Sequence, residues 1–211
     1  MSAPETRFYA VNDRPVAIVP VPGGGADCVV FDFATGELVP DRAYFEYVTP
    51  GSGKDVDALT EPEFEARLAA YRAQAGALAA ARVRQWAERL CATTGPAAQV
   101  AAALGFDGTA TRGDVAVDHP PAGYAAVSVR ALTGAGVAVD LRPAGRLLTR
   151  AALDTEFGAG SEVPMNPEGR LLRFAYRVDV AGAAAQCAIF AAFTNAGAAA
   201  AEVMLRRDTL G

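Results

Sequence analysis

Few residues in this chain could carry a chemical reaction. His119 is the only histidine among 211 residues, so a catalytic triad or a histidine-based metal site would rest on it alone. It precedes Pro120 and Pro121, and the residue before a proline is biased toward extended backbone, which predicts a loop. Ser128 lies in a strand pattern and lacks the Gly-x-Ser-x-Gly elbow of a hydrolase nucleophile. We therefore expect an exposed loop histidine and assign no catalytic residue.

Two glycine-rich stretches invite comparison with nucleotide-binding loops, but neither fits. The run Gly51-Ser52-Gly53-Lys54 ends in a lysine, as a phosphate-binding loop does. That loop also needs glycine five residues before Gly53, where Val48 stands, and Ser or Thr after the lysine, where Asp55 stands. Residues 23–25, all glycine, sit between strand patterns rather than before a helix and predict a turn. No cofactor is expected.

The acidic residues predict no metal site. Asp27 with Asp32, and Asp55 with Asp57, could pair their carboxylates, but their spacing does not show that they converge in space. Asp55-Val56-Asp57 lacks the further oxygen ligands that a calcium-binding loop supplies. We expect these residues to be turn and surface acids.

Arginine is the charged residue type most suited to a recognition surface, because its planar guanidinium makes paired hydrogen bonds. Two groups of arginines qualify, one in a helical segment and one in a strand segment. The candidate partner-binding residues are Arg72, Arg82, Arg89, Arg170, Arg173 and Arg177. The alternative is a solvated face that balances the acidic N-terminal half of the chain.

The longest segment with one periodicity is residues 60–93, which predicts a helix. Thr60 and Glu63 have the spacing of a capping box at its start. Steps of three and four then place an apolar stripe with one arginine along one face: Phe64, Leu68, Tyr71, Ala75, Leu78, Arg82, Trp86 and Leu90. Gly76 leaves a continuous helix or a break into two as alternatives. The helix either joins two lobes by packing on both or binds a partner.

Strand patterns flank this helix and predict an α+β fold with antiparallel sheets. Residues 1–58 form an N-terminal β meander, residues 59–94 the linking helix, and residues 95–211 a C-terminal α+β domain. The meander has strands at 8–11, 16–21, 27–33 and 37–39. The C-terminal domain has helices at 97–104 and 149–157, strands at 115–117, 124–131, 137–141, 171–180, 185–193 and 202–206, and tight turns at 181–182 and 195–197.

Charge and composition limit the kinds of partner that this chain is expected to bind. A net charge of −5 disfavours a general electrostatic grip on nucleic acid. Residues 181–201 are uncharged, but they are mostly alanine and glycine, so no membrane span is expected. Residues 1–7 show no secretory signal, and we expect a cytoplasmic chain.

The cysteines predict no cross-link. Cys28, Cys91 and Cys187 are odd in number, widely separated and without a Cys-x-x-Cys pair. A disulfide framework and a zinc knuckle are therefore not indicated. We expect all three to be reduced, buried thiols.

The N-terminal pattern resembles a short module at the front of uncharacterised actinobacterial proteins. The residues that carry this resemblance are Arg7-Phe8-Tyr9-Ala10-Val11-Asn12, Arg14-Pro15-Val16, Gly24, Asp27 and Phe33-Ala34-Thr35-Gly36-Glu37. The resemblance covers about a quarter of the chain and implies no particular activity. The C-terminal order of elements is similar to that of secretion-chaperone-like domains, an analogy that carries no residues across.

Three hypotheses follow for function. The first is a non-catalytic cytoplasmic protein-interaction module of an adaptor, immunity or chaperone kind, whose partner is another protein or a second copy. The second is a small enzyme or small-molecule binder with a pocket between the sheet regions around His119, Tyr124 and the arginines of residues 171–180. The third is a structural subunit of a larger assembly.

Overall fold

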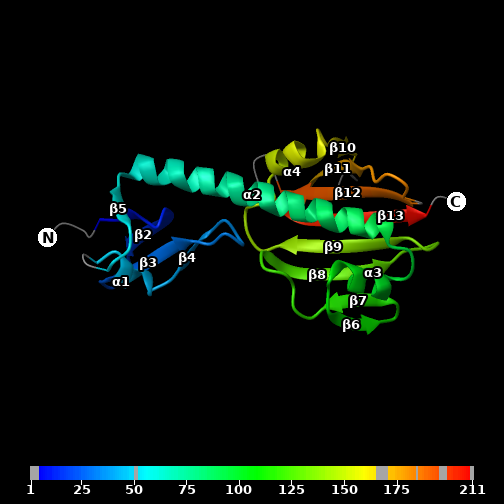
Figure 1. Ribbon diagram of the computed structural model, residues 1–211, viewed down its shortest axis with the longest axis horizontal. Helices are drawn as coiled ribbons and strands as arrows, with labels where there is room; N and C mark the ends of the chain where they lie inside the picture. Colours follow the sequence, from blue (N-terminus) through cyan, green and yellow to red (C-terminus); the bar gives the residue numbers. More distant parts are fainter. Residues whose placement is uncertain (1–4, 50–51, 165–170, 184, 195–198, 210–211) are drawn as a thin grey trace. The chain divides into compact units, whose positions relative to one another are not determined.

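The computed structural model describes residues 5–49, 52–164, 171–183, 185–194 and 199–209. It is an α+β protein in which both sheets are antiparallel, as the sequence predicted (Figure 1). The chain divides into two compact units, Met1–Ala75 and Gly76–Gly211. The long helix α2 (Glu61–Ala92) contributes residues to both units, and each unit is described separately below.

The first unit contains a five-stranded sheet with the order β4-β3-β2-β1-β5. Its strands are β1 (Arg7–Val11), β2 (Arg14–Pro20), β3 (Ala26–Phe31), β4 (Leu38–Pro40) and β5 (Val56–Leu59). The first four confirm the predicted meander, whereas β5 was missed and pairs with β1. Asn12 and Asp13, with φ of 47° and 67°, form the two-residue turn between β1 and β2, a conformation that matches the twist of a hairpin.

The first half of α2 covers one face of this sheet. Phe64 is buried and packs on Phe8 of β1, with ring centroids 4.7 Å apart, and Leu68 is buried one turn later. Tyr71 contacts Phe31 of β3 at 5.8 Å between centroids. The apolar face of a sheet must be buried against another element, and this helix supplies that layer. The predicted aromatic run before β5 contains a single helical turn, α1 (Tyr44–Tyr47).

Helix α2 is continuous, and the alternative of a break at Gly76 is wrong. Its start is the predicted capping box, in which the Glu63 carboxylate accepts hydrogen bonds from the Thr60 amide at 2.8 Å and the Thr60 hydroxyl at 2.7 Å. The predicted single stripe fails in the middle, because Leu78 is 66% exposed and Arg82 is also exposed. The predicted positions Trp86 and Leu90 are buried, and they share the buried face of the second half of α2 with Ala80, Val83, Ala87 and Cys91.

Gly76 has a packing role. A Cβ atom at this position would lie 2.9 Å from the backbone carbonyl oxygen of Leu147, closer than real Cβ atoms come. The glycine therefore lets the segment before helix α4 (Arg150–Phe157) run against α2. Close approach, rather than flexibility, explains a glycine in the middle of this helix.

The second unit is built on one eight-stranded antiparallel sheet with the order β10-β11-β12-β13-β9-β8-β7-β6. Its strands are β6 (Gly108–Thr111), β7 (Asp114–Val117), β8 (Tyr124–Ala131), β9 (Val137–Pro143), β10 (Ser161–Val163), β11 (Leu172–Val178), β12 (Ala185–Phe193) and β13 (Ala200–Thr209). The six predicted strands are present, and β6 and β10 were missed. The turn predicted at 195–197 lies outside the described residues, whereas the turn at 181–182 is present.

Three helices pack on the same face of this sheet. The second half of α2, helix α3 (Ala97–Leu104) and α4 share one apolar core with the inward side chains of β8, β9, β11, β12 and β13. The two short helices were predicted, and the Thr149 hydroxyl caps α4 by accepting a hydrogen bond from the Ala152 amide at 3.1 Å. Among the residues that the structure describes, no helix lies on the opposite face of the sheet (Figure 1).

Cys91 and Cys187 form a disulfide, so the prediction of three reduced thiols is wrong for this pair. Cys91 lies in the last turn of α2, and Cys187 lies on the helix-facing side of β12, 96 residues later in the sequence. The spacing of the cysteines in the sequence could not predict this bond, because it is the packing of the helix on the sheet that brings their Cα atoms to 6.0 Å from each other. Cys28 is free and buried, as expected.

A second link joins the end of α2 to the sheet. The Arg207 guanidinium of β13 is only 4% exposed and donates to the carbonyl oxygens of Thr93, of Gly95 at 2.8 Å and of Ala135 at 3.3 Å. Burial lowers the pKa of Arg207 from its usual value. Carbonyl oxygens from two loops satisfy its donors, which is the condition under which a buried charge is tolerated.

A substitution at Gly76 tests its packing role. In an exposed helix interior, glycine to alanine stabilises by about 1 kcal/mol. Because of the Leu147 carbonyl, we expect Gly76→Ala instead to lower the free energy of unfolding by about 1–3 kcal/mol. Urea denaturation measures this, with Ala77→Gly at the adjacent exposed position as the propensity control. A Gly76→Ala protein more stable than the wild type would contradict the close approach.

The disulfide should contribute measurably to stability. It joins two residues that are 96 positions apart in the sequence, and such cross-links typically contribute about 2–4 kcal/mol. We expect a reducing agent to lower the denaturation midpoint of the wild type. The double variant Cys91→Ser/Cys187→Ser should start at the lower midpoint and not respond to the reductant. Equal midpoints of the wild type with and without reductant would argue against the bond.

Candidate functional site

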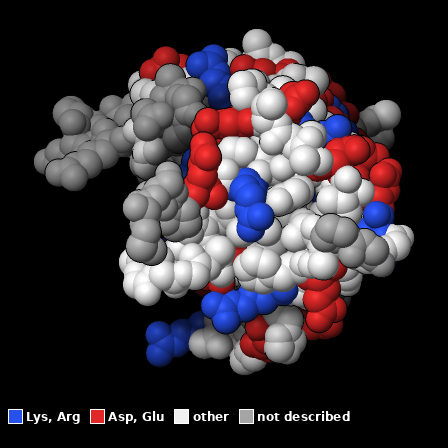
Figure 2. All heavy atoms as spheres, turned by 90° about the vertical axis from the view of Figure 1, so that its left-hand side faces the viewer, with Lys and Arg blue, Asp and Glu red and all other residues white. Residues whose placement is uncertain are grey.

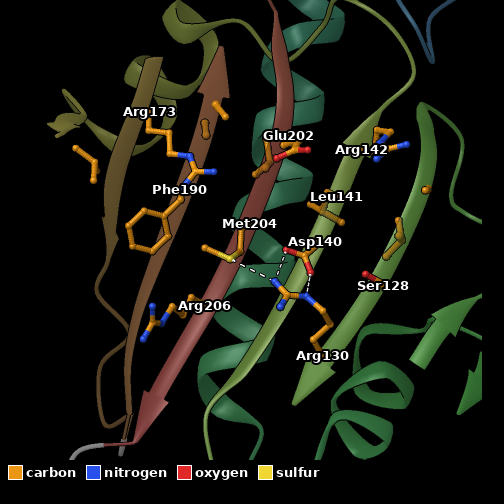
Figure 3. A pocket seen from close by; sticks show the side chains of 16 residues that line it. Ser128, Arg130, Asp140, Leu141, Arg142, Arg173, Phe190, Glu202, Met204 and Arg206 are labelled. Atoms are coloured by element: carbon orange, nitrogen blue, oxygen red, sulfur yellow. Dashed lines mark hydrogen bonds and ion pairs between the residues drawn. The ribbon is translucent and has the colours of Figure 1, made fainter. Parts of the chain in front are cut away.

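The open face of the eight-stranded sheet is hollowed. A cavity of about 650 Å³ lies over β8, β9, β13 and β12, and reaches β11 and β10 at one side. Figure 3 shows it from this face, with α2 passing behind the sheet. All of its lining residues belong to the second unit. Cavities of this volume are typical of ligand sites.

The strand register arranges the outward side chains of the hollow in three cross-strand rows. In the first row, Arg173 of β11 pairs with Ala192, which pairs with Glu202 of β13, and Arg142 of β9 pairs with Ala126 of β8. Glu202 and Arg142 each lie one position beyond the last β13–β9 pair, Val203 with Leu141. Figure 3 shows Glu202 between the two arginines of this row. Two cations thus flank one carboxylate at one end of the hollow.

The second row is apolar on one side and polar on the other. Phe190 of β12 faces Met204 of β13, and Met204 in turn pairs with Asp140 of β9, which faces Ser128 of β8. Phe190 and Met204 are both half-buried. Ala192, a small residue at a neighbouring outward position, also lines the hollow.

The third row contains three arginines that already have partners. Arg130 of β8 is hydrogen-bonded and ion-paired with Asp140, and this carboxylate raises the pKa of Arg130. Arg206 of β13 pairs with Asp208 at 2.9 Å, and Arg177 of β11 pairs with Asp179 at 2.8 Å. Alanines stand between these arginines in the register. This row is therefore close to neutral.

The uncompensated charge of the hollow lies in the first row. The side chains of Arg142, Arg173 and Glu202 are exposed, and they form no ion pair or hydrogen bond with another described residue. Two guanidiniums against one carboxylate leave an excess positive charge, in a chain whose net charge is −5. An exposed guanidinium without a partner can donate up to five hydrogen bonds to a ligand.

The structure brings only one of the six predicted arginines into the hollow, Arg173. Arg177 belongs to the same face but is paired with Asp179. The three on α2 lie elsewhere: Arg72 donates to the Gly36 carbonyl at 3.0 Å, Arg82 to the Ala122 carbonyl at 3.5 Å, and Arg89 is exposed. Arg170 lies outside the described residues.

Three arginines of the hollow were missed: Arg130, Arg142 and Arg206. A signal for them existed in the sequence, because each alternates with buried residues in its strand and so must point away from the helices. What the sequence did not contain was the pairing of β13 with β9, which joins two groups of strands into one sheet.

His119 and Tyr124 do not form a site together with the arginines. His119 is exposed in the loop before β8, and it does not line the hollow. Tyr124 is buried on the opposite, helix-covered face, where its ring lies 5.4 Å from that of Trp86. Burial raises the pKa of Tyr124 to about 12. Among the described residues, no group of three His, Cys, Asp or Glu side chains could hold a metal ion.

Comparison of the chain with known protein families, with characterised proteins and with solved structures finds no match. Within the described part of the chain, no helix has the length and apolar character needed to cross a membrane.

The two buried tyrosines make a matched test of the core around β8 and β11. The Tyr124 hydroxyl has no hydrogen-bond partner among the described residues, so Tyr124→Phe should leave the free energy of unfolding unchanged or raise it by about 1 kcal/mol. The Tyr176 hydroxyl donates a hydrogen bond to Asp154 at 3.1 Å, so Tyr176→Phe should lower the free energy of unfolding by about 1 kcal/mol. Denaturation at neutral pH checks both values, and the reverse order would contradict the assignment.

Alkaline pH should also destabilise the wild type through Tyr124. Its pKa rises from 10.0 to about 12 on folding, so the unfolded chain releases this proton first. The part of the free energy of unfolding that depends on the protonated Tyr124 hydroxyl is fully present below pH 10.0 and is lost as the pH rises toward about 12. The loss should be smaller in Tyr124→Phe than in the wild type, and equal losses would show that Tyr124 does not contribute.

Proposed function

We propose that this chain is a non-catalytic protein-interaction module of an adaptor, immunity or chaperone kind, and that it binds its partner with the hollow face of the eight-stranded sheet. The observation that carries the proposal is the first row of the hollow. Two exposed guanidiniums without a described partner flank an open, half-apolar concavity. Arginine beside aromatic and methionine side chains is a composition enriched in protein interfaces.

A small-molecule binder is the second candidate, because the volume of about 650 Å³ falls in the range of small-molecule sites. Catalysis would need a base and a nucleophile near each other, and the hollow offers Ser128 with no histidine beside it. A subunit role in a larger assembly is the third candidate, which light scattering of the purified chain addresses. No cofactor is part of the proposal.

The proposal excludes nucleic acid and membrane as partners. The net charge is −5, and the face drawn in Figure 2 has acidic side chains dispersed over it with basic ones between them. A nucleic acid would instead favour a continuous basic stripe. The excess positive charge of the hollow is one unit, because Arg142 and Arg173 stand against Glu202, and this suits local recognition of carboxylates.

Location is part of the same proposal. The sequence favours the cytoplasm, whereas a disulfide such as that of Cys91 and Cys187 is typical of oxidising compartments. We propose that the chain works where this bond is oxidised, with the cytoplasm as the alternative. Labelling of free thiols in intact cells decides between them: one reactive thiol after denaturation supports the oxidised form, and three support the cytoplasmic alternative.

The interaction is tested by affinity capture from cells that express tagged versions of the whole chain. The test variant is Arg142→Glu/Arg173→Glu, and the control is Arg89→Glu/Arg112→Glu, which makes the same charge change at exposed positions outside the hollow. We expect a stoichiometric protein that the wild type and the control retain and the test variant loses. A protein retained equally by all three, or no protein at all, would overturn the proposal.

A further inference from the structure

We infer that the hollow recognises an extended acidic segment of a partner protein, with two carboxylates about four residues apart and an apolar side chain between them. The inference rests on the proposed protein-binding function and specifies its ligand. It follows from the geometry of the first row, the apolar pair beside it and the position of Glu202.

The spacing comes from the order of strands. Arg173 stands on β11 and Arg142 on β9, with β12 and β13 between them. Three spacings of roughly 4.8 Å separate the two backbones by about 14 Å. An extended segment advances about 3.3 Å per residue, so side chains four residues apart span a similar distance. Such a segment would lie across the strands with one carboxylate at each guanidinium.

The middle of the segment must be uncharged and apolar. In an extended segment, residues i, i+2 and i+4 point to the same side, so the central side chain also faces the sheet. There it meets Ala192 in the first row and Phe190 and Met204 in the second. Both larger residues are half-buried, so part of their apolar surface is open to a ligand. Burying it would add to the two charge-assisted contacts.

Glu202 sets the selectivity. Its exposed carboxylate lies in the first row between Arg173 and Arg142 and repels an anion placed at the centre. A compact dicarboxylate is too short to contact both guanidiniums at once. Placed at the centre of the row, it would lie close to the Glu202 carboxylate. Two separated carboxylates lie on either side of Glu202, each farther from it than an anion at the centre would be. The arrangement therefore discriminates against small anions while it accepts a longer acidic segment.

The test uses the full chain and a fluorescent heptapeptide, Gly-Asp-Ala-Leu-Ala-Asp-Gly, blocked at both ends. Anisotropy at low salt should show saturable binding. Replacement of both aspartates by asparagine, or removal of two residues between them, should weaken binding at least tenfold. The variant Arg142→Gln/Arg173→Gln should lose binding to the same degree, whereas Arg89→Gln/Arg112→Gln should retain it. Circular dichroism confirms that each variant is folded.

Several outcomes overturn the inference. They are absence of saturable binding to the wild type, equal binding of the asparagine peptide, or full competition by millimolar succinate, which would point to a small-anion site. Failure of the peptide-binding inference can be distinguished from failure of the proposed protein-binding function. If affinity capture finds a partner lost in Arg142→Glu/Arg173→Glu while the peptide fails, the interaction stands and only the ligand is wrong. If both fail, the hollow is not a protein-binding surface.

Discussion

The core of the second unit depends on packing of the second half of α2 against the eight-stranded sheet. Ala80, Val83 and Leu90 are almost completely buried there, and two specific links hold the end of the helix in place. One is the disulfide of Cys91, and the other is the buried Arg207 guanidinium, which binds the carbonyl oxygens that follow the helix. A guanidinium stays charged inside a protein, so its carbonyl partners must stay near it, and this requirement fixes the loop as well as the helix.

With the helices gathered on one face, the other face is left open and carries the hollow. Antiparallel strands alternate their side chains, so burial of one set on the helix side exposes the other set to solvent. In the central strands that exposed set mixes alanine with arginine and acidic residues, which produces a concave floor with charged residues around it. The same register that builds the core therefore places Arg173, Glu202 and Arg142 in one row.

Local patterns in the sequence were enough to predict the class and most elements. The capping box of Thr60 and Glu63, the Thr149 cap and the alternation in β11 each depend on neighbouring residues, and each is present. The failures involve residues far apart in the chain. The disulfide, the β13–β9 pairing and the tight contact at Gly76 arise from packing of distant segments, which periodicity does not encode. The candidate arginines were chosen for their residue type, which does not reveal the cross-strand neighbours that line the hollow.

The third cysteine bears on how the chain acquires its one cross-link. Three thiols allow three pairings, and a wrong one would trap the chain during oxidative folding. Cys28 is buried in the first unit, and burial together with Asp41 and Asp27 raises its pKa to about 11. At neutral pH only about one thiol in ten thousand would then be ionised, and the thiolate is the form that attacks disulfides. The first unit is synthesised before Cys187, and in its folded form it keeps Cys28 buried and away from exchange.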